Sequence, residues 1–134
     1  MNIDWNQAEA PSIDDFSRMA GEAFRALPQA FRSLCGEVPL VVQEFPGEDV
    51  IADMDLESEF DILGLFQGPD LAGRQGRGGT PEPTMIFLYR RPILDYWAEH
   101  HISLGDVIRH VLIHEIGHHF GLSDEDMDKI ENGT

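Results

Sequence analysis

Residues 110–124 read HVLIHEIGHHFGLSD, and this stretch decides what kind of fold the rest of the chain must build. Its apolar residues recur on most sides of a helix, which predicts a buried helix with Ser103 as its N-cap and its end near Phe120. His114 and His118 stand four residues apart, so their imidazoles project from one helix face about 6 Å apart. Two neutral imidazoles in this position can hold one metal ion, and zinc suits them.

Three further residues complete a candidate catalytic zinc site. Gly121 can adopt a positive φ at the end of the helix without steric cost, so the chain can turn back there. Asp124 follows on the returning chain and can supply a carboxylate oxygen as the third ligand. Glu115, next to the first histidine, would face a water molecule beside the ion and remove its proton as general base. The predicted site is therefore His114, His118 and Asp124 on Zn²⁺, with Glu115 as the catalytic base.

A plainer interpretation of the same residues stays open. In it the helix is an ordinary core helix with hydrogen-bonded histidines, and Asp124 merely caps the next helix. His110 lies one turn before His114, where it can be an extra ligand, a partner of the ligands or a satisfied core histidine. His119 is expected to take part in packing. A buried helix with polar side chains needs partners for them, and a metal ion is one such partner.

Length, charge and cysteine content limit the class of protein. The chain has 134 residues, which suits one compact domain over residues 1–134. Its single cysteine, Cys35, excludes an internal disulfide and a cysteine-rich zinc site. A net charge of −16 would repel phosphate groups, so we expect neither nucleic-acid nor anionic-membrane partners. No apolar run approaches the roughly 18 residues of a membrane span, and the first residues, MNIDWNQAEAP, do not resemble a secretory signal. These features predict a cytoplasmic protein.

The remaining pattern predicts an α+β (α/β) fold with about three strands. The strands are expected in short apolar runs bounded by glycine or proline, at residues 38–45, 62–66 and 85–89. Helical periodicity and capping residues predict helices at residues 12–27, 28–34, 92–97, 103–120 and 124–131. The glycine-rich residues 71–83 are expected to form a flap or a linker.

The run MIFLY at residues 85–89 has two interpretations. It can be an exposed edge strand that aligns a peptide by β-augmentation, or an interior strand, because its alternation is weak. Two arginines follow it, which is unusual in so acidic a chain. Arg90 and Arg91 are expected to pair with Asp95 or Glu99.

The motif HExxHxxGxxD resembles the zinc signature of zincins, with a metzincin-like extension in which Asp stands in place of the usual third His. Three segments are similar to the small bacterial zincin-like metallopeptidase family: LGLFQG at 63–68, MIFLYRRPIL at 85–94 and HVLIHEIGHHFGLSDEDM at 110–127. The resemblance extends over most of the chain. It implies a minimal zincin fold, a small mixed sheet packed against helices with HExxH on the active-site helix. It also implies His114, His118 and Asp124 as zinc ligands and Glu115 as catalytic base.

Two departures from the larger metzincins bear on activity. Ten residues follow Asp124, too few for the C-terminal subdomain of those enzymes, and Met127 comes too soon to be their separate Met-turn. The leading hypothesis is a zinc-dependent hydrolase, a metallopeptidase acting on a peptide or protein substrate. The alternative is a catalytically weak or inactive, zinc-stabilised module that binds peptides. A metal-dependent ribonuclease is disfavoured by Asp124 in place of a histidine and by the negative charge.

Overall fold

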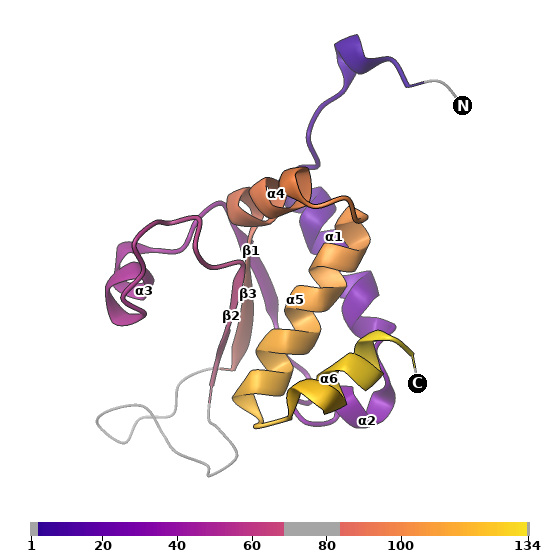
Figure 1. Ribbon diagram of the computed structural model, residues 1–134, viewed down its shortest axis with the longest axis vertical. Coiled ribbons are helices and arrows are strands. Elements are labelled where there is room, and N and C mark those ends of the chain that lie inside the picture. The colour runs from indigo at the N-terminus through magenta and orange to yellow at the C-terminus, as the bar shows by residue number, and fades with distance from the viewer. Residues whose placement is uncertain (1–2, 69–83, 134) are drawn as a thin grey trace.

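The computed structural model describes residues 3–68 and 84–133 (Figure 1). Its helices are η1 Trp5–Gln7, α1 Ile13–Arg25, α2 Gln29–Arg32, α3 Glu48–Asp53, α4 Arg90–Glu99, α5 Leu104–His119 and α6 Asp124–Glu131. Its strands are β1 Leu40–Gln43, β2 Gly64–Gln67 and β3 Met85–Tyr89, and the predicted α+β class is confirmed. The glycine-rich segment, residues 71–83, lies outside the described residues. Within the described ranges, no helix combines the length and apolar character needed to cross a membrane.

The strands form a mixed sheet in the order β1-β3-β2. β1 runs parallel to β3, and β2 runs antiparallel to it. Of the two interpretations of residues 85–89, the interior strand is therefore correct. β1 is shorter than the expected run at 38–45, because its register pairs only Leu40 to Gln43 with β3. The pairing stops where β3 ends at Tyr89 and α4 begins.

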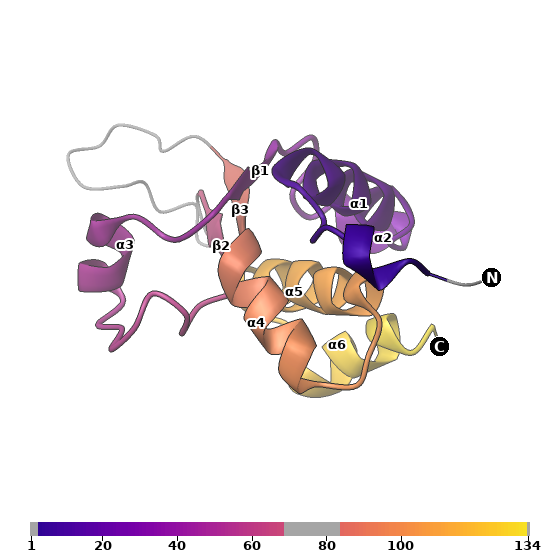
Figure 2. The same cartoon turned by 90° about the horizontal axis from the view of Figure 1, so that it is seen from above.

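α1 and α5 pack on each other and together cover one face of the sheet. α1 contacts β1, while α5 contacts β2 and β3. Seen from above, these two helices lie on one side of the strands and α3 lies on the other (Figure 2). The core fills the space between the helix pair and the sheet, and its fully buried members include Phe16, Ile86, Leu88, Ile108 and Leu112. α5 is thus a central element of the fold, held on several sides.

Both ends of α5 follow the sequence prediction. The Ser103 hydroxyl accepts a hydrogen bond from the backbone N–H of Asp106 at 3.1 Å and begins the helix. At the other end Gly121 has a φ of 75°, and the backbone N–H of Leu122 donates to the carbonyl oxygen of Gly117 at 2.8 Å. This is the geometry of a glycine-terminated helix. The turn lets the chain reverse, so that α6 packs against α5 (Figure 1).

The two arginines at the start of α4 join separate segments of the chain. The Nη1 atom of Arg90 lies 2.9 Å from Glu44 Oε1, and its Nε atom donates to the carbonyl oxygen of Pro11 at 2.6 Å. Arg91 Nε lies 3.6 Å from the same Glu44 oxygen. The pairs predicted within α4 are replaced by these contacts, because α4 begins directly after the buried β3 and its first side chains reach back toward the end of β1.

Candidate metal centre

One side of α5 faces the sheet. Val111 lies so close to β2 that a Cβ atom added to Gly64 would stand 2.7 Å from Val111 Cγ1. His119 stacks on Phe66 of β2 with ring centroids 4.1 Å apart, which confirms its predicted role in packing. Glu115 is four residues from both Val111 and His119 and therefore shares their side of the helix. We call Val111, Glu115 and His119 the sheet side of α5.

A second side of α5 carries three histidines at four-residue intervals, His110, His114 and His118, and we call it the histidine face. The ring centroids of His110 and His114 are 4.0 Å apart, and those of His114 and His118 are 5.6 Å apart. His110 and His114 are partly buried, whereas His118 is exposed. The structure thus makes neighbours of His114 and His118, and their role as metal ligands stays a prediction.

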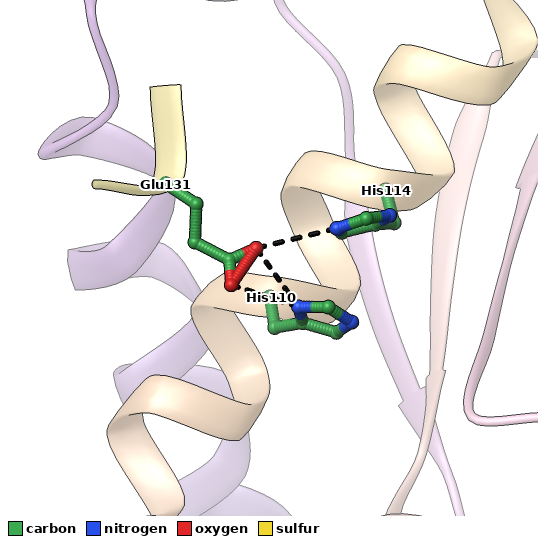
Figure 3. A group of neighbouring side chains, drawn as sticks. All are labelled: His110, His114 and Glu131. Carbon is green, nitrogen blue, oxygen red and sulfur yellow. Dashed lines mark hydrogen bonds and ion pairs between the residues drawn. The ribbon is translucent and has the colours of Figure 1, made fainter. Parts of the chain in front are cut away.

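Glu131, the last residue of α6, reaches across to the histidine face (Figure 3). Its Oε1 atom lies 2.8 Å from His110 Nδ1 and 3.2 Å from His114 Nε2, and its Oε2 atom lies 3.0 Å from His110 Nδ1. One donor atom from each residue lies within 4.8 Å of the other two. Over residues 3–68 and 84–133, this is the only group of three such side chains spaced to hold a metal ion. Two imidazoles and a carboxylate are a donor set of catalytic zinc sites.

Contacts at the middle and at the end of α6 hold it in this position. In its middle, the fully buried Met127 packs on Gly117, where an added Cβ would stand 2.7 Å from Met127 Cγ and closer still to the sulfur. Glycine at position 117 therefore permits the close approach of the two helices. Near its end, Arg109 Nη2 donates to the carbonyl oxygen of Ile130 at 2.8 Å, and Nη1 donates to that of Glu131. The Glu131 backbone is thus anchored beside the histidine face.

The electrostatic setting of Glu115 differs from that of an ordinary surface glutamate. Burial raises the pKa of Glu115 to about 7. Burial also raises the pKa of Tyr89, at the end of β3, to about 12, and the negative charges of Asp49 and Glu115 add to this shift. A carboxyl group with a pKa near neutrality has the proton affinity that a general base needs at neutral pH.

The pKa values on the histidine face move in the opposite direction. Burial lowers the pKa of His114 and the charge of His110 lowers it further, although Glu131 opposes this change. Burial by itself would raise the pKa of Glu131, but the hydrogen bond from His110 and the charges of His110 and His114 bring it below its ordinary value. A neutral His114 and an ionised Glu131 are the protonation states in which these groups bind a metal ion.

Asp124 lies apart from this group. It is the first residue of α6 and is exposed. The residue that caps α6 is Ser123, whose hydroxyl accepts a hydrogen bond from the backbone N–H of Asp126 at 3.0 Å, so the alternative in which Asp124 is the cap is wrong. Among the residues that the structure describes, Asp124 belongs to no three-donor group. Its predicted role as third ligand stays a prediction.

Sequence reasoning does not find Glu131, because it stands in the acidic run SDEDMDKIE, which has the composition of a solvated helix face. Met127 is the one residue of this run that could have pointed to Glu131. An apolar residue in an acidic helix marks the face that packs, and Glu131 is four residues further along that face. His110, for which a core position was one expectation, has 42% of its side chain exposed and pairs with Glu131 instead.

A pocket of about 280 Å³ opens beside this group. His110 and Glu131 form part of its wall, and Tyr96, Ile102 and Val107 contribute aromatic and apolar surface. Two of the three donors of the group, His110 and Glu131, are therefore reachable from solvent.

Comparison with known proteins identifies a family. Residues 35–134, which are 100 of the 134 residues, match the family model described as zincin-like metallopeptidase. The matched part contains all the strands described above and helices α3 to α6, and it includes Glu115 and both sets of candidate ligands. A search among curated proteins found no match. The family description supports a zinc-dependent, peptidase-like function in general terms.

Proposed function

The chain belongs to the zincin-like metallopeptidase family, and from this membership we propose that it is a zinc-dependent peptidase in which Glu115 acts as general base. The observation that carries the proposal is the position of HExxH. The family match covers this motif, which lies on α5. His114 of the motif also belongs to the group of three side chains that are spaced to hold a metal ion. We expect a peptide or protein substrate, no nucleic-acid or membrane partner in view of the charge of −16, and a cytoplasmic location.

The donors on the histidine face fit zinc by their chemistry. His114 and His118 offer imidazoles from successive helical turns, and a carboxylate is available either from Asp124, as the sequence predicts, or from Glu131. Burial lowers the pKa of His114 and so favours the neutral form that binds metal. Zinc, when bound, polarises a carbonyl group and makes a water molecule easier to deprotonate.

Glu115 is suited to accept a proton and return it. It directly follows His114, and its pKa of about 7 leaves both protonation states well populated at neutral pH. The ionised carboxylate can take the proton of an attacking water, and the protonated carboxyl can then give a proton to the leaving amine. Tyr89 has a pKa of about 12 and therefore keeps its own proton at neutral pH.

A peptide-library assay tests the proposal. Zinc-loaded protein is incubated with the library, and the products are identified by mass spectrometry. We expect cleavage by the native protein and a loss of about 10²- to 10⁴-fold in rate for Glu115→Gln, because the amide cannot act as a base. Zinc content should be unchanged in that variant. Asp95→Asn, at an exposed acid on α4, is the matched control and should retain full activity. Undiminished turnover by Glu115→Gln would remove Glu115 from the mechanism.

A second candidate is a zinc-stabilised peptide-binding module with weak or no catalysis. β2 favours it, because this strand lies at an edge of the sheet and in contact with α5, and an edge strand can pair with the backbone of a peptide. The same library separates the two functions. Peptides that bind specifically to the zinc-loaded protein and are recovered intact would support the module.

A further inference from the structure

We propose that Glu131, at the end of α6, is the carboxylate ligand of the zinc ion in place of Asp124, and that His110 orients it. The proposal rests on the proposed function for the presence of zinc and for His114 and His118 as ligands. It changes the third ligand and gives His110 a positioning role. The helix α6 then contributes directly to the metal centre through its last residue.

The distance between the donors supports this assignment. Two donors on a tetrahedral zinc ion, with bonds of about 2.0–2.1 Å, lie about 3.3–3.4 Å apart. His114 Nε2 and Glu131 Oε1 lie 3.2 Å apart (Figure 3). That separation is at the long end of the range for an N–H···O hydrogen bond. The separation of His114 Nε2 and Glu131 Oε1 therefore matches the spacing of two ligands of one ion.

His110 provides the second interaction that a ligating carboxylate requires. Its Nδ1 atom lies 2.8 Å from Oε1 and 3.0 Å from Oε2 of Glu131. When Nδ1–H donates to Oε2, the other oxygen, Oε1, which faces His114, is left for the ion. Partners of this kind fix the orientation of metal ligands and raise affinity. His110 therefore acts on the ion through Glu131.

Asp124 and Glu131 cannot easily serve the same ion. They are seven residues apart on α6, which separates their backbones by about 10 Å along the helix axis. An ion at His114 therefore has one of the two carboxylates beside it. Glu131 is the one that contacts His114, whereas Asp124 is exposed. Arg109 strengthens the choice, because its bonds to the carbonyl oxygens of Ile130 and Glu131 hold this end of α6 against α5.

A purely structural role is the competing explanation for the same contacts. Glu131 could tie α6 to α5 through its pair with His110 and bind no metal. Arg109 already makes that connection through the backbone, so the carboxylate is not needed for it. The side chain of Glu131 is also 31% exposed and lines the pocket beside α5, so its carboxylate can be reached from solvent.

The test measures zinc affinity of the full-length, metal-free protein by calorimetric titration, together with the visible absorption spectrum of the cobalt form. Glu131→Gln should lower zinc affinity by more than the roughly 10- to 100-fold that is typical for loss of an outer partner, and it should change the cobalt spectrum. Asp124→Asn should leave both unchanged. Asp128→Asn, at another exposed acid of α6, is the matched control and should also have no effect.

Further variants separate a ligand from a structural contact. His110→Gln should lower affinity by about 10- to 100-fold and largely retain the cobalt spectrum, whereas His101→Gln, at an exposed histidine, should do neither. Glu131→His supplies a different donor at the same place, so it should bind zinc and shift the cobalt spectrum, and it keeps the test valid if Glu131→Gln folds poorly.

Two results would overturn the proposal. Native zinc affinity in Glu131→Gln together with a large loss in Asp124→Asn would make Asp124 the ligand, and the proposed function would stand. A lower melting temperature of metal-free Glu131→Gln with unchanged zinc affinity would make Glu131 a structural residue. Failure of the native protein to bind zinc at all would instead contradict the proposed function itself.

Discussion

The two sides of α5 create opposite conditions for two glutamates, Glu115 of α5 itself and Glu131 of α6. On the sheet side, Glu115 is partly buried, and this burial raises its pKa to about 7. On the histidine face, Glu131 meets His110 and His114, and these partners bring its pKa below the ordinary value in spite of burial. The comparison shows how environment sets the chemistry of one residue type. A carboxylate with a raised proton affinity suits a general base, and one that stays ionised suits a metal ligand.

The largest effect is expected from removing the contact that holds α6 against α5. This change should disturb the surroundings of Glu131 beside the histidine face and leave those of Glu115 on the sheet side intact. Met127 is 0% exposed and packs on Gly117. Met127→Ala should lower the free energy of unfolding by about 2–5 kcal/mol, measured by urea denaturation, and should weaken zinc binding. The exposed Met54→Ala is the control and should change stability by less than about 0.5 kcal/mol. Equal stabilities of the two variants would contradict the importance of this contact.

A smaller effect is expected from disturbing the sheet side. A Cβ atom at position 64 would stand 2.7 Å from Val111 Cγ1 and 2.8 Å from the carbonyl oxygen of Phe87. Gly64→Ala should therefore destabilise the protein by about 1–3 kcal/mol and move β2 relative to α5. At Gly105, an added Cβ meets nothing within 4 Å, so Gly105→Ala should leave the unfolding transition unchanged or raise it. Thermal unfolding followed by circular dichroism compares the two.

The pH dependence of stability should sharpen the contrast between the two carboxyls in the metal-free protein. Glu115 has a folded pKa above its unfolded value of 4.5, so its contribution is full below pH 4.5 and is lost as the pH rises through about 7. Glu131 has a folded pKa below 4.5, so its contribution is present above pH 4.5 and is lost as the pH falls through the folded value.

The two variants should therefore change different parts of the stability profile. Glu115→Gln should remove a decline between pH 4.5 and about 7, and Glu131→Gln should remove a decline on the acid side of pH 4.5. Melting temperatures across this range give the measurement. Parallel changes in both variants would mean that the two carboxyls share one environment.

The smallest effect is expected on the solvent side of α6. Glu125 and Lys129 form an i,i+4 pair with 3.6 Å between Oε1 and Nζ, and their side chains are 80% and 61% exposed. Glu125→Gln should change the free energy of unfolding by no more than about 0.5 kcal/mol and should leave zinc affinity unchanged. A large loss in this variant would mean that α6 is held by its outer surface rather than by Met127.

Much of the fold was predictable because its signals are local. Ser103 and Gly121 delimit α5 through a hydroxyl cap and a positive φ, and both depend on a few neighbouring residues. The order of the strands was not predictable, because weak alternation in β3 suits an edge and an interior equally. Pairing between Arg90 and Glu44 joins residues 46 apart, and no periodicity reports on such a contact.

The candidate site also has a part that depends on local sequence and a part that depends on long-range packing. The placement of His114, Glu115 and His118 on one helix was predictable because helical spacing is a short-range signal, and their roles in the site stay predictions. Glu131 was not found, because its relation to His110 depends on how α6 docks against α5. That docking depends on the contact of Gly117 with Met127 and on the bonds of Arg109 to the end of α6. The composition of the acidic run SDEDMDKIE does not predict the contact of Gly117 with Met127 or the bonds of Arg109.

The double attachment of α6 has a consequence for the dynamics of the protein. Because Met127 secures the middle of α6 and Arg109 its last residues, α6 should open as one cooperative unit rather than fray residue by residue. Any ion held by Glu131 would stabilise only the closed form, so opening would become rarer as the ion binds. Amide hydrogen exchange in α6 would then report occupancy of the metal centre.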